Sequence, residues 1–162
     1  MNRVFLIVIV AWLTGCAEPS VDKPVDAGCE ENHRCEYVFK KDMGINVNQG
    51  QLQITQKSGT LLFRFSSIFI DDPKIADDEI TESLLFEVSS TATSFMYHDL
   101  TTQNVYYTRS CFCGGDNQVK VTQGYLHGTK IADQWQVTGE VIVTANGQTK
   151  TFQFEIKPFL AE

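Results

Sequence analysis

An all-β domain is the fold that this sequence predicts, and three features of the chain indicate it. Short segments of alternating apolar and polar residues recur, and turn-forming residues separate them. No segment after residue 13 shows a sustained helical apolar period with caps. Many short strands joined by turns are typical of an antiparallel β-sandwich or a small meander barrel, and we expect the sandwich. Helix content should be low beyond the first residues.

The alternation predicts a first hairpin in the middle of the chain. Residues 51–56 alternate polar and apolar side chains, and Lys57-Ser58-Gly59 supplies a turn. A return strand follows, because apolar residues two positions apart share one face of a strand. Its inner face is expected to consist of Leu61, Phe63 and Phe65.

A second hairpin is predicted near the C-terminus. Residues 137–144 and 149–156 flank Asn146-Gly147, a dipeptide that tolerates the positive φ angles of a type I′ turn. The expected inner face of the second of these strands is Phe152, Phe154 and Ile156. Between the two hairpins, further short strands are predicted at 84–89, 93–98, 105–109, 118–122 and 125–131.

The first residues have the layout of a secretory signal peptide. Arg3 gives a short basic start, and Val4 to Leu13 is an apolar run of ten residues. Ten helical residues rise about 15 Å, whereas the hydrocarbon core of a bilayer is roughly 30 Å thick. We therefore expect this segment to be removed rather than to span a membrane.

The end of that segment, Leu13-Thr14-Gly15-Cys16, resembles the lipobox of bacterial lipoproteins. The resemblance implies cleavage before Cys16 and two or three acyl chains on this cysteine, which together anchor a protein stably. It also implies the outer membrane, because Ala17 stands where an acidic residue would retain a lipoprotein at the inner membrane. We expect a signal peptide over 1–15, a lipidated extended tether over 16–28 and a single β domain over 29–162.

Four cysteines remain in the domain: Cys29, Cys35, Cys111 and Cys113. An exported domain meets an oxidising compartment, so structural disulfides are expected. A bridge between Cys111 and Cys113 would close a small ring, so we favour bonds from both of them to the Cys29 and Cys35 segment. The alternatives are a redox-active dithiol at Cys111 and Cys113, or a zinc site that includes His33, for which the ligand spacing is wrong.

The run Arg109-Ser110-Cys111-Phe112-Cys113 looks like a hairpin found in a family of uncharacterised bacterial lipoproteins. The likeness covers some twenty residues and implies no activity.

Acidic residues outnumber basic ones, 20 to 13, and the formal charge is −7. Such a surface repels phosphate backbones, and no basic stripe is visible, so nucleic acid is not an expected partner. One acidic loop could hold calcium through carboxylate oxygens, although solvated carboxylates are the commoner outcome and no cofactor is expected. Its candidate ligands are Asp71, Asp72, Asp77, Asp78 and Glu79, with Glu82 nearby.

No catalytic residues are assigned. His98-Asp99 invites a catalytic interpretation, but no Gly-x-Ser-x-Gly elbow accompanies it. The period-two rule sends either Tyr106 or Tyr107 outward, where an aromatic ring can mark a binding surface. The sequence thus favours a non-enzymatic envelope lipoprotein whose β domain binds a protein, glycan or cell-wall partner. The alternatives are a barrel-type carrier of a small apolar ligand and a thiol-disulfide enzyme.

Overall fold

The computed structural model describes residues 29, 32–69, 80–111, 117–145 and 147–162, and for 154–157 the backbone alone. This part of the chain contains strands and no helix, so the all-β prediction is confirmed. The strands are β1 (His33–Asn48), β2 (Gln51–Phe69), β3 (Ile80–Ser89), β4 (Ser94–Tyr97), β5 (Val105–Cys111), β6 (Asn117–Lys120), β7 (Gln123–Ile131), β8 (Gln134–Ala145) and β9 (Gln148–Ala161).

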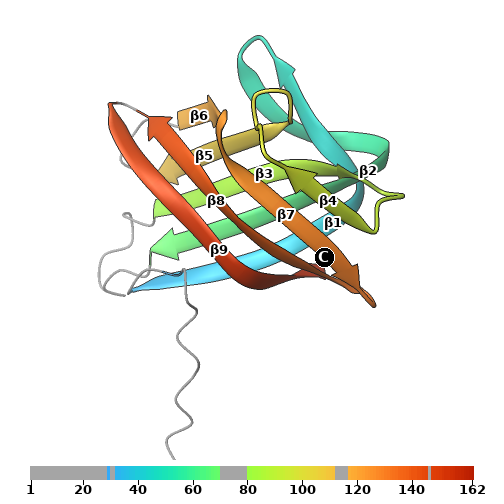
Figure 1. The fold of residues 1–162 in the computed structure, drawn as a ribbon. Coiled ribbons are helices and arrows are strands. Elements are labelled where there is room, and N and C mark those ends of the chain that lie inside the picture. Colours follow the sequence, from blue (N-terminus) through green and yellow to red (C-terminus); the bar gives the residue numbers. More distant parts are fainter. Residues whose placement is uncertain (1–28, 30–31, 70–79, 112–116, 146) are drawn as a thin grey trace, which may run out of the picture.

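The strands form one open sheet in the order β4-β7-β8-β9-β1-β2-β3-β5-β6. Neighbouring strands are antiparallel except β1 and β9, which pair in parallel where Val38 meets Leu160 and Phe39 meets Ala161. The sheet curls so that its two halves face one another across the core, an arrangement consistent with either expected architecture, the sandwich or the meander barrel (Figure 1). The β1–β9 contact joins these halves into a single sheet.

Aromatic rings fill the space between the halves. Phe63 of β2 is fully buried at the centre, and its ring centroid lies 4.8 Å from that of Phe86 in β3. It also lies 5.5 Å from Trp135 of β8 and 5.4 Å from Phe159 of β9, which belong to the opposite half. Burying a ring of this size contributes about 1.5–3 kcal/mol, so these contacts hold the curled sheet together.

The first predicted hairpin is wrong, because its two predicted strands are parts of one strand, β2, and both pair with β1. β2 runs without interruption from Gln51 to Phe69, and the chain reverses instead at Gln49 and Gly50, both with positive φ. The Lys57-Ser58-Gly59 segment forms a bulge, since Lys41 pairs with Leu61 whereas Met43 already pairs with Gln56. Gly59 has a φ of 79°, which glycine adopts without strain, and its N–H donates to Asp42 Oδ1 at 3.0 Å. A bulge and a turn therefore call for the same residue types.

Beyond this bulge the tip of the β1–β2 hairpin packs on the outer face of the sheet. Ile45 from the tip is buried with Leu62 of β2 and Leu85 of β3, next to Tyr106 of β5. The Leu52 N–H donates to Gln118 Oε1 at 2.6 Å, which ties the tip to β6. Of the two consecutive tyrosines, Tyr106 is thus the outward one, and the hairpin tip contacts it.

The C-terminal hairpin is confirmed. Ala145 pairs with Gln148, and Gly147 has a φ of 75°. Phe152 points into the core as expected, whereas the side chains of Phe154 and Ile156 lie outside the described residues. The five other predicted strands correspond to β3, β4, β5, β6 and β7.

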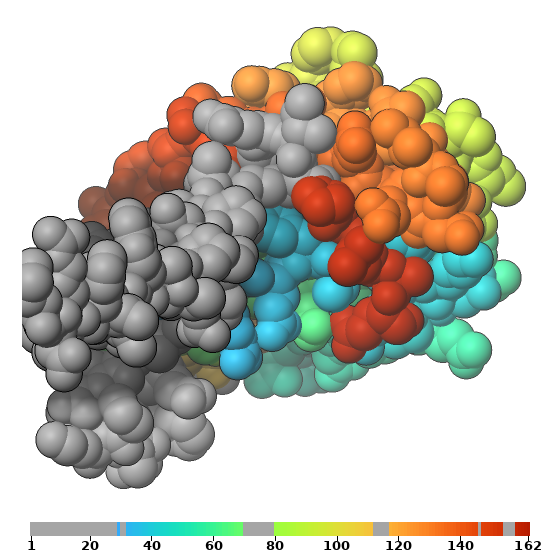
Figure 2. Space-filling view, turned by 90° about the horizontal axis from the view of Figure 1, so that it is seen from below, coloured from blue at the N-terminus to red at the C-terminus, as the bar shows by residue number. Residues whose placement is uncertain are grey.

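The C-terminal end of β9 lies against β1, as Figure 2 shows in red and cyan. The Glu162 N–H donates to the Phe39 carbonyl at 3.0 Å. Its carboxylate pairs with Lys40 and Arg64, each at 3.0 Å, on the outer face of β1 and β2. These contacts fix the end of the chain on the sheet.

Candidate functional site

One end of the curled sheet, where β5 and β8 end and β3 and β9 begin, contains a pocket of about 260 Å³. We call it the mouth pocket. Val143 and Ala145 of β8 form an apolar wall. Its polar lining consists of Glu82 from β3, Tyr107 and Arg109 from β5, Asn117 from β6, and Gln148 and Lys150 from β9. Both halves of the sheet thus contribute to one polar site.

Glu82 occupies the centre of this pocket and is almost buried, with 12% of its side chain exposed. The Tyr107 hydroxyl donates to Glu82 Oε1 at 2.6 Å, and the Lys150 ammonium donates to Glu82 Oε2 at 2.5 Å. Because Lys150 comes from β9 and Glu82 from β3, this ion pair crosses between the two halves. It holds the mouth at a fixed width.

The protonation states follow from these contacts. Burial alone would raise the pKa of Glu82, but hydrogen bonds from Lys150 and Tyr107, with the charges of Lys150 and Arg109, outweigh it and lower the pKa. Burial, and then the hydrogen bond to Glu82 and its charge, raise the pKa of Tyr107. Near neutral pH the pocket therefore contains an ionised carboxylate and a neutral phenol.

Arg109 lies beside this pair without being part of it. In the strand register Arg109 is opposite Glu82 on one side and Asn117 on the other, and it is half-buried. Within the described ranges, no hydrogen bond or ion pair involves its guanidinium group. Two cations and one carboxylate among the described lining residues give this lining one excess positive charge in a chain of formal charge −7.

A second pocket of about 220 Å³ adjoins the first and shares Lys150 with it. Phe65, Phe152 and Cys29 contribute to its lining. The Lys150 Nζ lies 5.3 Å from the centroid of the Phe152 ring, a cation–π distance. Ser67, Thr151 and Gln153 also line it, so a pocket of mixed aromatic and polar character lies next to the charged one.

Cys29 and Cys35 form a disulfide with an S–S distance of 2.08 Å, which corrects the favoured pairing of this segment with Cys111 and Cys113. A six-residue separation lets the chain fold back on itself at the start of β1, so no partner from β5 is needed. Cys111 is also disulfide-bonded, and Cys113 lies outside the described residues. The disulfide places Cys29 at the second pocket.

Other candidates from the sequence do not come together at this site. Asp71, Asp72, Asp77, Asp78 and Glu79 lie outside the described residues, as do Cys16 and Ala17. Across the described ranges no cluster of three or more His, Cys, Asp or Glu side chains could hold a metal ion. In the same part of the chain no helix is long and apolar enough to cross a membrane.

The two histidine candidates have ordinary surroundings. His33 packs its ring 5.2 Å from that of Phe69. His98 and Asp99 are both exposed, and Asp99 Oδ1 accepts hydrogen bonds from the Thr101 N–H at 2.8 Å and its hydroxyl at 2.6 Å. Asp99 therefore stabilises a turn.

Sequence reasoning did not assemble the mouth pocket, although a signal for it exists. Glu82 is in phase with the inward-facing Leu84 and Phe86, and Arg109 is in phase with the buried Tyr107. A charged residue that shares the core face of a strand is either paired or functional. Lys150, two residues before the buried Phe152, follows the same rule.

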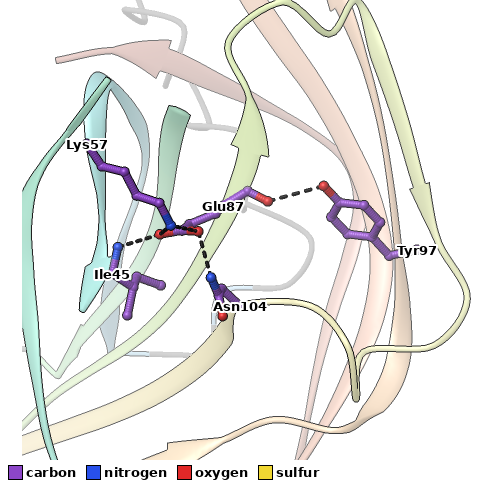
Figure 3. Close-up of polar contacts among 5 residues, drawn as sticks. All are labelled: Ile45, Lys57, Glu87, Tyr97 and Asn104. Atoms are coloured by element: carbon purple, nitrogen blue, oxygen red, sulfur yellow. Dashed lines mark hydrogen bonds and ion pairs between the residues drawn. The ribbon is translucent and has the colours of Figure 1, made fainter. Parts of the chain in front are cut away.

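A second carboxylate network lies on the outer face, under the hairpin tip (Figure 3). Glu87 Oε1 accepts from the Ile45 N–H at 2.5 Å and from Lys57 at 3.0 Å, while its Oε2 accepts from Lys57 and Asn104, each at 2.8 Å. The Tyr97 hydroxyl donates to the Glu87 backbone carbonyl at 3.2 Å. We call this network the Glu87 clasp, and it fastens the bulged hairpin to β3.

Comparison with known proteins adds no family to this description. The chain matches no protein family model, no curated protein and no solved structure. The function is therefore inferred from the geometry of the site itself.

Proposed function

We propose that the protein is an envelope lipoprotein, anchored through lipid on Cys16, whose β domain is a non-catalytic binding module. The leader and the Leu13-Thr14-Gly15-Cys16 motif support the anchor, and Ala17 supports the outer membrane. The partner, an envelope protein or glycan, is engaged at the mouth pocket. Because Cys29 follows the tether directly and contributes to the second pocket, the binding end of the domain is also the tethered end.

One observation carries the proposal. Three ionisable side chains and a phenol from three strands converge on an open pocket at the end of a core of aromatic and aliphatic side chains. Burying charged side chains costs desolvation free energy that apolar side chains of similar volume would not, so stability alone does not explain why charged residues occupy these positions. Binding sites are more precise when their groups stand on strands and are fixed by neighbouring hydrogen bonds, as Tyr107 and Lys150 are here.

The protonation states support binding rather than acid–base catalysis. A general acid or base works best with a pKa near the operating pH. At Glu82 and Glu87, burial acts to raise the pKa, but hydrogen bonds and nearby charges outweigh burial, so the pKa of each is lowered. At Tyr107, burial and the contact with Glu82 both raise the pKa. All three shifts move the pKa values away from neutral pH.

The anchor is tested by growing cells with an alkyne-tagged fatty acid. The wild-type protein should take up the label and fractionate with membranes, and Cys16→Ala should take up none and accumulate as the uncleaved precursor. Labelling of Cys16→Ala at the wild-type level would overturn the anchor.

The binding role is tested by photo-cross-linking in intact cells. A benzoylphenylalanine replaces Gln148, which is exposed at the rim of the mouth pocket, or Thr129, which is exposed on β7 and pairs with Gln136 of β8, nine residues before the pocket residue Ala145. A discrete heavier adduct should form from position 148 and not from position 129. Equal adducts from both positions, or none from position 148, would contradict binding at the mouth.

A further inference from the structure

We infer that the mouth pocket binds an oxyanion, a carboxylate or phosphate group carried by the partner, and that Arg109 is its principal ligand. The inference rests on the proposed function and names the chemistry of the group that enters the pocket. It follows from the distribution of charge, from the hydrogen-bonding capacity that is already used, and from the size of the pocket.

The described lining of the pocket is positively charged, unlike the chain as a whole. Among the described residues that line the pocket, Arg109 and Lys150 face one carboxylate, Glu82, so this lining carries one excess positive charge while the chain as a whole is acidic. An acidic surface repels anions at long range, so anion binding requires a local site of opposite sign. The described lining of the mouth pocket has this sign, which suits an anionic group.

Arg109 differs from Tyr107 and Lys150 in its hydrogen bonds. Tyr107 and Lys150 each donate to Glu82. The Arg109 guanidinium carries five N–H donors, and no described residue accepts a hydrogen bond from them. A guanidinium fork matches two oxygens of a carboxylate or phosphate, and half-burial strengthens such a contact.

Neutral donors complete the site. The amide side chains of Asn117 and Gln148 line the same pocket, from β6 and β9 respectively. A volume of about 260 Å³ is at the small end of ligand sites, which usually measure roughly 300–1,000 Å³. The pocket therefore suits a charged head group, while the rest of the partner lies outside or against Phe65 and Phe152 in the adjoining pocket.

The test is a titration of the processed lipoprotein in neutral detergent with methyl phosphate and, separately, with acetate. Binding is followed through the arginine Nε–Hε signals in NMR spectra, which report millimolar affinities. The wild-type Arg109 signal should shift and saturate with at least one probe, and the tighter probe identifies phosphate or carboxylate as the preferred group.

Three variants make the result specific. Arg109→Gln should weaken binding at least tenfold, and Arg109→Lys, which keeps the charge without the fork, should weaken it about threefold. Arg34→Gln is the matched control, because Arg34 pairs with Glu36 on the surface and lies outside the pocket. This substitution removes the same charge as Arg109→Gln. Its affinity should stay within twofold of the wild type. A urea unfolding curve for each variant verifies that it is folded. If Arg109→Gln does not fold, Arg109→Lys is the test variant in its place.

Two results would overturn the inference: no saturable shift with either probe, or equal loss of affinity in Arg109→Gln and Arg34→Gln, which would indicate general electrostatics. If the cross-link from position 148 persists in either case, the oxyanion site alone fails and the binding role stands. If the cross-link is also absent, both fail.

Discussion

Two glutamates of β3 occupy contrasting environments. Glu82 and Glu87 are five residues apart, so they project from opposite faces of the sheet. Glu82 faces the interior at the mouth, and Glu87 faces outward under the hairpin tip. Each accepts hydrogen bonds from a lysine, Lys150 or Lys57, and the exposed fractions of the two carboxylates are similar, 12% and 10%.

The difference lies in what surrounds each carboxylate. Glu87 accepts hydrogen bonds from the Ile45 backbone amide, Lys57 and Asn104, and these bonds connect parts of the scaffold. Glu82 accepts hydrogen bonds from Tyr107 and Lys150, and it borders an open pocket that is also lined by Arg109. The comparison teaches that a saturated buried carboxylate stabilises the fold, whereas one beside a pocket and an additional cation organises a binding site.

The largest effect is expected from Glu87→Ala. It removes the acceptor for the Ile45 amide, Lys57 and Asn104 at a site where water enters poorly, so the free energy of unfolding should fall by about 2–4 kcal/mol. Urea denaturation measures this change. The matched control is Glu36→Ala, because that carboxylate forms an exposed ion pair worth about 0–1 kcal/mol. Equal stability of the two variants would contradict the structural role of the clasp.

Gly44→Ala should have the next largest effect. A Cβ on Gly44 would lie 2.4 Å from Lys57 Cδ and 2.7 Å from Glu87 Oε1, so the clasp would have to open to admit it. We expect a loss of about 1–3 kcal/mol from this overpacking. In a double-mutant cycle with Glu87→Ala the two losses should be less than additive, because both disrupt one network. Full additivity would show that the steric conflict lies elsewhere.

Acid should weaken the fold through both glutamates. At each, burial would raise the pKa, but hydrogen bonds and lysine charge lower it below the ordinary value of 4.5. A lowered folded pKa contributes stability that is present above the unfolded pKa and is lost as the pH falls through the folded pKa. The stability difference between the wild type and Glu87→Gln should therefore shrink below about pH 4.5 in unfolding curves. A difference that does not change with pH would contradict an ionised Glu87.

The smallest effect is expected from Glu82→Gln, on binding. The amide keeps the size of the side chain and removes the one carboxylate among the described lining residues, so the affinity for methyl phosphate or acetate should rise about fivefold, as expected for one unit charge near 4 Å in water. The same titration measures it. Weaker binding by Glu82→Gln would show that Glu82 contributes more by positioning Lys150 than it opposes the anion by charge.

Most of the described strands were predictable because inward and outward alternation is a local property, but β1 (His33–Asn48) was not among the predicted strands. The Asn146-Gly147 hairpin followed from two residues whose backbone preference is strong. The first hairpin was misplaced because Lys57-Ser58-Gly59 and Gln49-Gly50 are both turn-forming, and only pairing with β1 distinguishes the bulge from the turn. Long-range register decides between such segments.

The site was less predictable than the fold. Glu82 and Lys150 are 68 residues apart and meet only because the sheet curls. Tyr107, Arg109 and Asn117 join them through the register of β3, β5 and β6. No short motif encodes this arrangement. The available signal was that Glu82, Arg109 and Lys150 each share a strand face with buried core residues. The disulfide preference failed for a related reason, since the path of the chain between Cys29 and Cys35 was unknown.

The most direct test of the contrast between the two ends of β3 is a methyl phosphate and acetate titration of the wild type, Arg109→Gln and Glu87→Gln, paired with urea unfolding of each. Arg109→Gln should lose at least tenfold in affinity with little change in stability, and Glu87→Gln should lose stability and keep its affinity. If Glu87→Gln loses affinity as much as Arg109→Gln does, the mouth pocket is not a separate binding site and the account is wrong.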